Sequence, residues 1–210
     1  MKNIIKFLIC IVGFAGLVSC ETYKVEDPEQ TAVGDFDGRW ICFAYDKADQ
    51  TNPVGLYIVE IFNTTFNDSD KFWMSVADCD PVAGGYDFLD ALKFKTDCDV
   101  NSLTFNASDV EASQPRTCYN IYWEKGYFTL GYRNMVPATG YKVSVTDGKV
   151  TKNGIDTDSG YKADAIEFSY KRTNPDNTTV EYVFKGMKNT GWAEDMGAYY
   201  DFIDAQGWYW

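Results

Sequence analysis

Residues 165–185 read Ala165-Ile-Glu-Phe-Ser-Tyr-Lys171, then Arg-Thr, then Asn174-Pro-Asp-Asn177, then Thr-Thr-Val180-Glu-Tyr-Val-Phe-Lys185. Apolar and polar side chains alternate on both sides of the central segment, so each half has one apolar and one wet face. Asn, Pro and Asp favour the backbone conformations of a turn. The stretch therefore predicts two antiparallel strands joined by a short loop, each with one face buried.

The same alternation recurs along the chain, with turn residues at short intervals. Candidate strands lie at 39–45, 54–62, 71–78, 91–96, 102–106, 127–133, 141–146, 149–152, 165–171 and 179–185. Asp147-Gly148 is a two-residue hairpin signal between two of them. Apolar side chains at helical spacing in 191–210 predict a short C-terminal helix. We expect an all-β fold of about 8–10 antiparallel strands, closed into a barrel or stacked as a sandwich.

The first twenty residues are typical of an export signal. Lys2 and Lys6 precede an apolar run of about a dozen residues, which is too short to span a bilayer comfortably. The run ends in Leu17-Val-Ser-Cys20, which has the residue order of a bacterial lipobox. We expect residues 1–19 to be a lipoprotein signal peptide, residues 20–34 an acidic tether and residues 35–210 one domain. Acylated Cys20 would then hold the protein on a membrane. The alternative is an ordinary signal peptide with a chance cysteine.

Composition excludes several kinds of site. The 210 residues contain no histidine, which removes Ser-His-Asp and Cys-His catalysis and the usual imidazole metal sites. We expect no metal site and no cofactor. The net charge of −12, without a basic stripe, argues against nucleic acid as a partner.

Four cysteines remain in the expected domain, namely Cys42, Cys79, Cys98 and Cys118. An exported protein can form disulfides, and four cysteines allow three pairings. We expect Cys79–Cys98 and Cys42–Cys118 if bridges form, because Cys79 and Cys98 each follow a predicted strand. Buried free thiols are the alternative.

Several short motifs together carry a resemblance to a known protein family. They are Asp37-Gly-Arg-Trp40, Phe72-Trp-Met74, the segment 141–150, Ile155–Gly160 with 163–168, and 183–186 with Thr190-Gly-Trp192. In this order the chain resembles, over about residues 35–195, the small lipoproteins of Bacteroidetes known as lipid-binding putative hydrolases. The resemblance implies a lipocalin-like barrel, a lipid or other small apolar ligand, and a place in the cell envelope at the outer membrane.

The expected ligand site is the interior of that barrel. Aromatic residues on the predicted strands should turn inward, some as core and others as pocket lining. The candidate ligand-binding residues are Trp73, Phe94, Tyr132, Phe168, Tyr170 and Phe184. Trp40 should plug the closed end, with Arg172 or Lys188 as a cation that stacks on it.

Catalysis has little support in the sequence. Ser159-Gly-Tyr-Lys162 is the one Ser-x-x-Lys match, and it falls in a predicted loop rather than at a helix start. Asp156-Thr-Asp-Ser-Gly160 lacks the remaining ligands of a calcium loop and is expected to be a turn. No catalytic residue is assigned, and whether the protein is an enzyme stays open.

Two other functions remain: a hydrolase of unrecognised mechanism, or a surface glycan-binding accessory protein that works with polysaccharide-uptake proteins. An enclosed aromatic cavity would favour a lipid, whereas a coplanar exposed row of aromatic rings would favour a glycan.

Overall fold

The computed structural model describes residues 30–78, 91–114, 117–124, 127–134 and 138–206. Within these ranges it describes the side chains of all residues except 114–138. The folded unit begins at Thr31. Val33 is fully buried in its core. Residues 31–34, which the sequence assigned to the tether, are therefore part of the folded unit.

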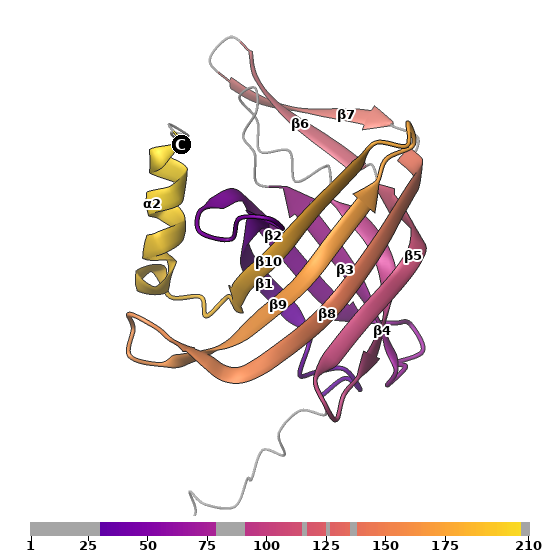
Figure 1. The fold of residues 1–210 in the computed structure, drawn as a ribbon. Coiled ribbons are helices and arrows are strands. Elements are labelled where there is room, and N and C mark those ends of the chain that lie inside the picture. Colours follow the sequence, from indigo (N-terminus) through magenta and orange to yellow (C-terminus); the bar gives the residue numbers. More distant parts are fainter. Residues whose placement is uncertain (1–29, 79–90, 115–116, 125–126, 135–137, 207–210) are drawn as a thin grey trace, which may run out of the picture. The chain divides into compact units, whose positions relative to one another are not determined.

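Eight antiparallel strands form a closed barrel in the order β1-β10-β9-β8-β5-β4-β3-β2 (Figure 1). The barrel strands are β1 (Gly38–Asp46), β2 (Pro53–Asn63), β3 (Lys71–Asp78), β4 (Leu92–Asp99), β5 (Thr104–Gln114), β8 (Ala138–Asp156), β9 (Lys162–Thr173) and β10 (Thr179–Lys188). Because β1 pairs with both β2 and β10, the sheet has no free edge. The predicted all-β, lipocalin-like barrel is confirmed.

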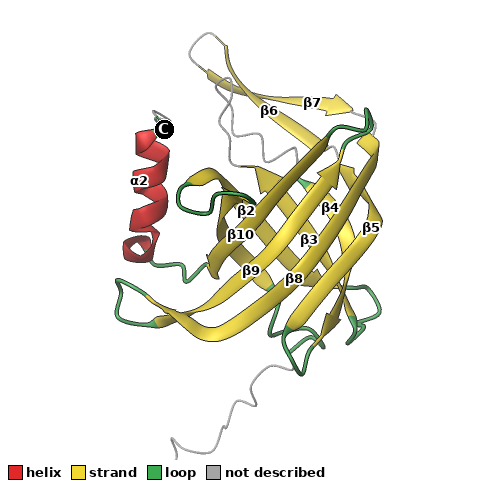
Figure 2. Cartoon of the chain, in the orientation of Figure 1, coloured by secondary structure: helices red, strands yellow, loops and turns green. Residues whose placement is uncertain are grey.

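A two-stranded hairpin, β6 (Thr117–Glu124) and β7 (Tyr127–Asn134), is inserted between β5 and β8. In Figure 2 it extends from the end of the barrel where β5 ends and β8 begins. The sequence predicted β7 but not β6.

The predicted hairpin of 165–185 is β9 and β10. Phe168 lies opposite Phe184, and Tyr170 lies opposite Tyr182. Asn177 closes the connecting turn in the left-handed region, with φ 66°, and its amide donates to Asn174 O at 2.9 Å.

The expected hairpin at Asp147-Gly148 is wrong. Strand β8 runs on through these residues, and its register to β9 shifts between Thr146 and Lys149, which is a β-bulge. Asp147 adopts φ 56°, and a Cβ on Gly148 would lie 2.4 Å from Phe105 O. A bulge and a tight turn need the same left-handed backbone, so local sequence does not distinguish them.

One end of the barrel is plugged by the segment 31–37. Phe36 is fully buried and packs against Phe72, with ring centroids 5.2 Å apart. Trp40 Nε1 donates to Phe36 O at 3.0 Å, and Lys188 Nζ lies 5.6 Å from the Trp40 ring centroid. Of the two cations considered for Trp40, Lys188 therefore occupies the position.

The C-terminal helix is confirmed as α2 (Gly197–Ala205), preceded by a 3₁₀ turn, η2 (Ala193–Met196). In Figure 1 it lies outside the barrel. Tyr199 packs there in a second hydrophobic cluster with Ile41 of β1, Leu56 of β2 and Met187 of β10. Among the described residues no helix is long and apolar enough to cross a membrane.

Candidate functional site: a tyrosine-lined cavity in the barrel

A cavity of about 520 Å³ lies inside the barrel toward the end opposite the plug. This volume is in the range of small-molecule sites. Its walls come from β2, β3, β8, β9, β10 and the β9–β10 turn. The lining residues are Tyr57, Val76, Tyr141, Tyr170, Arg172, Asn174, Pro175, Asp176, Val180 and Tyr182.

Below the cavity the barrel is filled by packed aromatic rings. Phe184 contacts Tyr57 edge-to-face at 4.9 Å, Tyr170 at 5.4 Å and Tyr182 at 6.1 Å between ring centroids. It also stacks on Phe168 at 4.9 Å. Phe168 and Phe184 are both fully buried. These rings close the cavity from below, so a ligand would enter only the half of the barrel away from the plug.

Tyr170 joins the packed rings to the cavity wall. Its side chain is almost fully buried, and this burial raises the pKa of the phenol far above its usual value, although the nearby charge of Arg172 lowers it somewhat. The hydroxyl therefore stays protonated at physiological pH and can donate a hydrogen bond.

Arg172 is the charged residue on the inward face of β9. Its Nε is buried and has no hydrogen-bond partner. The neighbouring carboxylate in the cavity wall, Asp176, accepts bonds from the Thr178 amide at 3.0 Å and the Thr178 hydroxyl at 2.6 Å. Among the described side chains, no ion pair is formed by Arg172.

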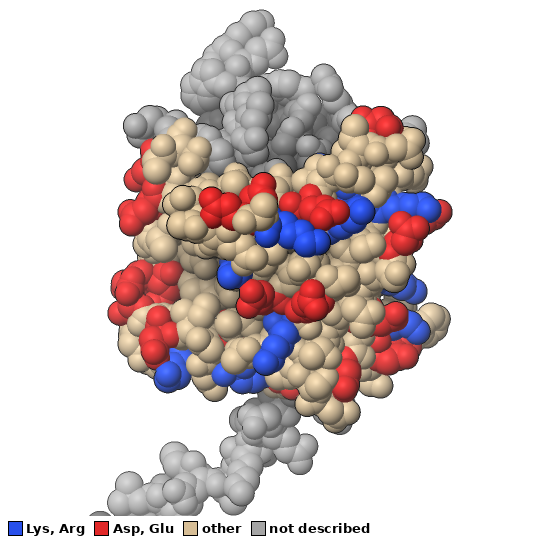
Figure 3. All heavy atoms as spheres, in the orientation of Figure 1, with Lys and Arg blue, Asp and Glu red and all other residues tan. Residues whose placement is uncertain are grey.

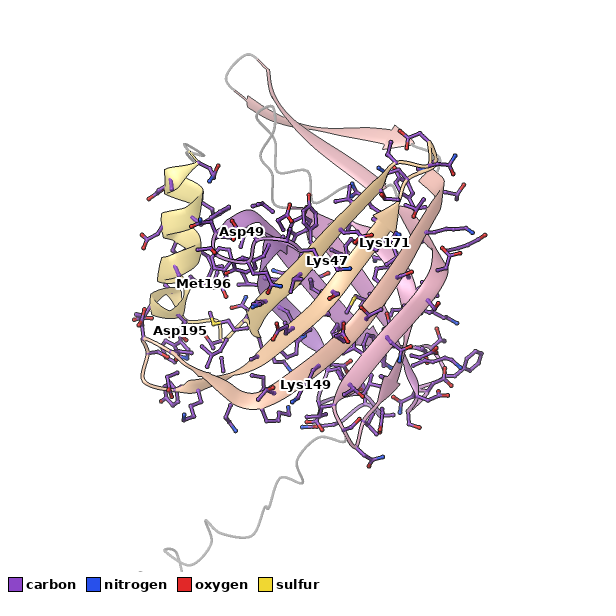
Figure 4. The ribbon with its side chains drawn as sticks, in the orientation of Figure 1. Lys47, Asp49, Lys149, Lys171, Asp195 and Met196 are labelled. Carbon is purple, nitrogen blue, oxygen red and sulfur yellow. The ribbon has the colours of Figure 1, made fainter. Side chains whose placement is uncertain are left out.

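The outer face of the same strands is ordinary charged surface. Glu181 pairs with Lys47 at 3.4 Å and with Lys171 at 3.3 Å. Figure 4 shows these two lysines on the outside of the barrel wall. In the face drawn in Figure 3, Lys and Arg are interspersed with Asp and Glu.

The structure brings four of the six candidate ligand residues into the interior. Tyr170 lines the cavity, whereas Phe94, Phe168 and Phe184 belong to the packed core. Tyr132 is on β7, and its side chain lies outside the described residues.

The expected inward orientation of Trp73 is wrong. Phe72 and Met74 are fully buried in the interior, so Trp73 between them faces outward, where Lys95 Nζ lies 5.3 Å from its ring centroid. Three apolar residues in a row carry no alternation, and the sequence therefore gives no sign of which face is buried.

Sequence reasoning missed most of the cavity wall. Tyr182 shares a face with Phe184, and Tyr57 shares a face with Val59 and Ile61, so the period-two pattern could have identified both. The sequence suggests Arg172 only as a cation for Trp40, although this residue continues the inward face of Tyr170.

The Ser-x-x-Lys residues do not form a nucleophile and base. Ser159 Oγ donates to Asp195 Oδ2 at 3.0 Å, whereas Lys162 Nζ pairs with Asp156 at 2.7 Å. Asp195, labelled in Figure 4, also accepts from the Ser159 amide at 2.8 Å and from Thr190 at 2.6 Å. The group therefore ties the β8–β9 loop to the segment after β10.

Comparison with known proteins agrees with this barrel. The family described as lipid-binding putative hydrolase matches residues 25–193, most of the chain. The chain belongs to this family. None of the curated proteins matches it. A closed barrel with an interior cavity is the fold expected of a lipid-binding protein of this family.

The cysteine pairings expected from the sequence involve Cys79 and Cys118, whose side chains lie outside the described residues. Both pairings stay predictions.

Proposed function

We propose that this protein is an exported lipoprotein, anchored in the cell envelope through acylated Cys20, whose barrel binds a lipid in the cavity beside Tyr170. The observation that carries the ligand part is the cavity of about 520 Å³ above the packed aromatic rings. The lipobox order at Leu17–Cys20 supports the anchor.

The exposed aromatic side chains favour this ligand over a glycan. Among the described residues, the exposed large aromatic side chains are Phe66, Tyr161, Trp192 and Tyr200, which lie on four separate segments, and no ring contact joins any two of them. The segments are the β2–β3 loop, the β8–β9 loop, the stretch after β10, and α2. A glycan platform needs neighbouring rings in one plane, whereas the tyrosines of the cavity wall surround an interior space.

The ligand part is tested with phenylnaphthylamine, a neutral apolar fluorescent probe, and with variants of two valines. Val180 lines the cavity and is only partly buried, so Val180→Trp should fill the cavity without disturbing the core. Val54 is 58% exposed and does not line the cavity, which makes Val54→Trp the matched control.

We expect Val180→Trp to weaken probe binding by about tenfold or more and Val54→Trp to leave it unchanged. Mass spectrometry of the purified native protein should detect a co-purified lipid that is absent from Val180→Trp. Equal probe binding by both variants would place the ligand elsewhere and contradict the proposal.

The anchor is tested separately by cell fractionation. Cys20→Ala should move the protein from the membrane fraction to the soluble fraction, because acyl chains supply the membrane affinity. Normal processing of Cys20→Ala with full membrane association would overturn this part and leave the cavity proposal standing.

A further inference from the structure

The strongest unexplained feature of the cavity is Arg172. Of the two arginines whose side chains the structure describes, Arg39 is exposed and pairs with Glu60 at 2.8 Å. Arg172 instead lines an interior cavity with its Nε buried and unbonded. A buried donor without a partner costs free energy, and most proteins satisfy such groups with protein atoms or water.

The position of Arg172 along β9 sets its depth in the cavity. Inward residues alternate along this strand as Ile166, Phe168, Tyr170 and Arg172. Two residues of strand place Arg172 about 7 Å further along β9 than Tyr170, in the direction away from the plug. The guanidinium therefore lies at the end of the cavity beside the β9–β10 turn, which we call the mouth. The tyrosine rings of the cavity wall lie between it and the packed core.

The other polar groups at the mouth leave the guanidinium available. Asp176 is the acidic residue of the cavity wall, and its Oδ1 is engaged by the amide and the hydroxyl of Thr178. Asn174 Nδ2 donates to the Thr178 hydroxyl at 2.8 Å. These bonds stabilise the β9–β10 turn from within and do not reach Arg172.

A guanidinium has five donors in a planar fork that matches a carboxylate or a phosphate. We propose that the cavity takes a lipid with an anionic headgroup, a carboxylate or phosphate that pairs with Arg172. This inference rests on the lipid binding proposed above. The headgroup lies near the mouth. The start of the acyl chain runs inward along Tyr170 and Val76, which line the same cavity.

The proposal predicts a headgroup preference that depends on one side chain. Dodecanoate, dodecyl phosphate and dodecanol are compared as competitors of phenylnaphthylamine, because they share one chain length and differ in charge. Inorganic phosphate is tested alone, to separate an anion site from a site for an anionic lipid.

Arg172→Met should weaken the binding of dodecanoate and of dodecyl phosphate by about tenfold to a hundredfold, which is the usual effect of losing a charged hydrogen-bond partner. Dodecanol should stay within about twofold of the native affinity, because its contacts are apolar. Arg172→Lys should restore part of the loss, since it keeps the charge but not the fork.

The matched control is Lys171→Met, which removes the same charge one residue away on the outer face of β9. It should change none of the affinities. Circular dichroism and the thermal midpoint of Arg172→Met confirm that the barrel is intact before its affinities are compared.

The outcomes separate this inference from the proposed function. Equal binding of all three lipids by native protein and Arg172→Met overturns the role of Arg172 and leaves lipid binding intact. An equal loss of lipid affinity in Lys171→Met would show that the effect comes from net charge. That result would also overturn the role of Arg172. Failure of every lipid and of the neutral probe contradicts the proposed function itself. Competition by inorganic phosphate alone, without lipid binding, shows an anion site only and contradicts both.

Discussion

Cys98 shows how its surroundings set the chemistry of one side chain. It lies in β4, and its thiol is 3.8 Å from Ser69 O. Partial burial, together with the negative charges of Asp70, Asp97 and Asp99, raises the pKa of Cys98 from 9.0 to about 11. Because the thiolate is the reactive form, this thiol should be inert at neutral pH.

We expect Cys98 of the native protein to react with iodoacetamide at pH 8 about 100-fold more slowly than Cys98 of the urea-unfolded protein. The reason is that a pKa higher by two lowers the thiolate fraction about 100-fold. Peptide mass spectrometry follows the labelling of this one cysteine over time. Equal rates in the two states would contradict the prediction.

The same labelling tests the expected Cys79–Cys98 bridge. The protein is prepared from the cell envelope without reductant and then unfolded. Labelling of Cys98 before reductant is added shows a free thiol and rules the bridge out, whereas labelling only after reduction supports it.

At the scale of elements, α2 depends on one of two adjacent tyrosines. The hydroxyl of Tyr199 donates to Ile41 O at 3.2 Å, and its ring stacks on Phe43 with centroids 4.8 Å apart. Tyr199 is 6% exposed, whereas Tyr200 is 44% exposed. Tyr199 therefore makes the buried contact of the helix with β1, and Phe202 adds a second ring contact to Phe43 at 5.5 Å between centroids.

Tyr199→Ala should lower the free energy of unfolding by about 3 kcal/mol, as expected for a large buried ring. Tyr200→Ala is the matched control and should change it by less than about 0.5 kcal/mol. Urea unfolding followed by tryptophan fluorescence measures both. Similar losses in the two variants would show that α2 is not held through Tyr199.

At the scale of the whole molecule, two carboxylates join segments that are distant in sequence. Burial alone would raise the pKa of Asp164 and of Asp195, but hydrogen bonds and, for Asp164, the charge of Lys152 hold both below the usual value. Lys152 pairs with Asp164 and with Asp35 at 2.9 Å each, which ties the plug segment to β8 and β9.

The stability of the protein should therefore fall in acid. A carboxyl whose pKa is lowered by folding contributes its full stabilisation above the unfolded value of about 3.9, and this is lost as the pH falls through the lower folded value. We expect the free energy of unfolding to decline below about pH 4. Urea unfolding across this range measures the decline.

Asp195→Asn should reduce the slope of that decline, because it removes one of the carboxyls that bind protons on unfolding. Asp201→Asn, at an exposed position of α2, controls for the loss of one charge. A slope in Asp195→Asn equal to that of the control would contradict the role of Asp195.

Local pattern alone predicts a strand and its buried face where apolar and polar side chains alternate clearly. Phe168 and Tyr170 alternate with Glu167, Ser169 and Lys171, and the strand period of two places both on one face whatever the rest of the chain does. The turn at Asn174–Asn177 and the C-terminal helix follow from equally local chemistry. Where the pattern was silent, as at Trp73 among apolar neighbours, the face was decided only by packing.

Tertiary structure alone decided the depth of each residue and its partners. From the sequence, either Lys188 or Arg172 could be the cation that stacks on Trp40. Closure of the barrel places Lys188 against Trp40 at the plug and Arg172 at the opposite end. It also brings Asp195 to Ser159, 36 residues earlier. Such pairs depend on strand order and register, and these are set by contacts between segments far apart in the chain, which no local pattern encodes.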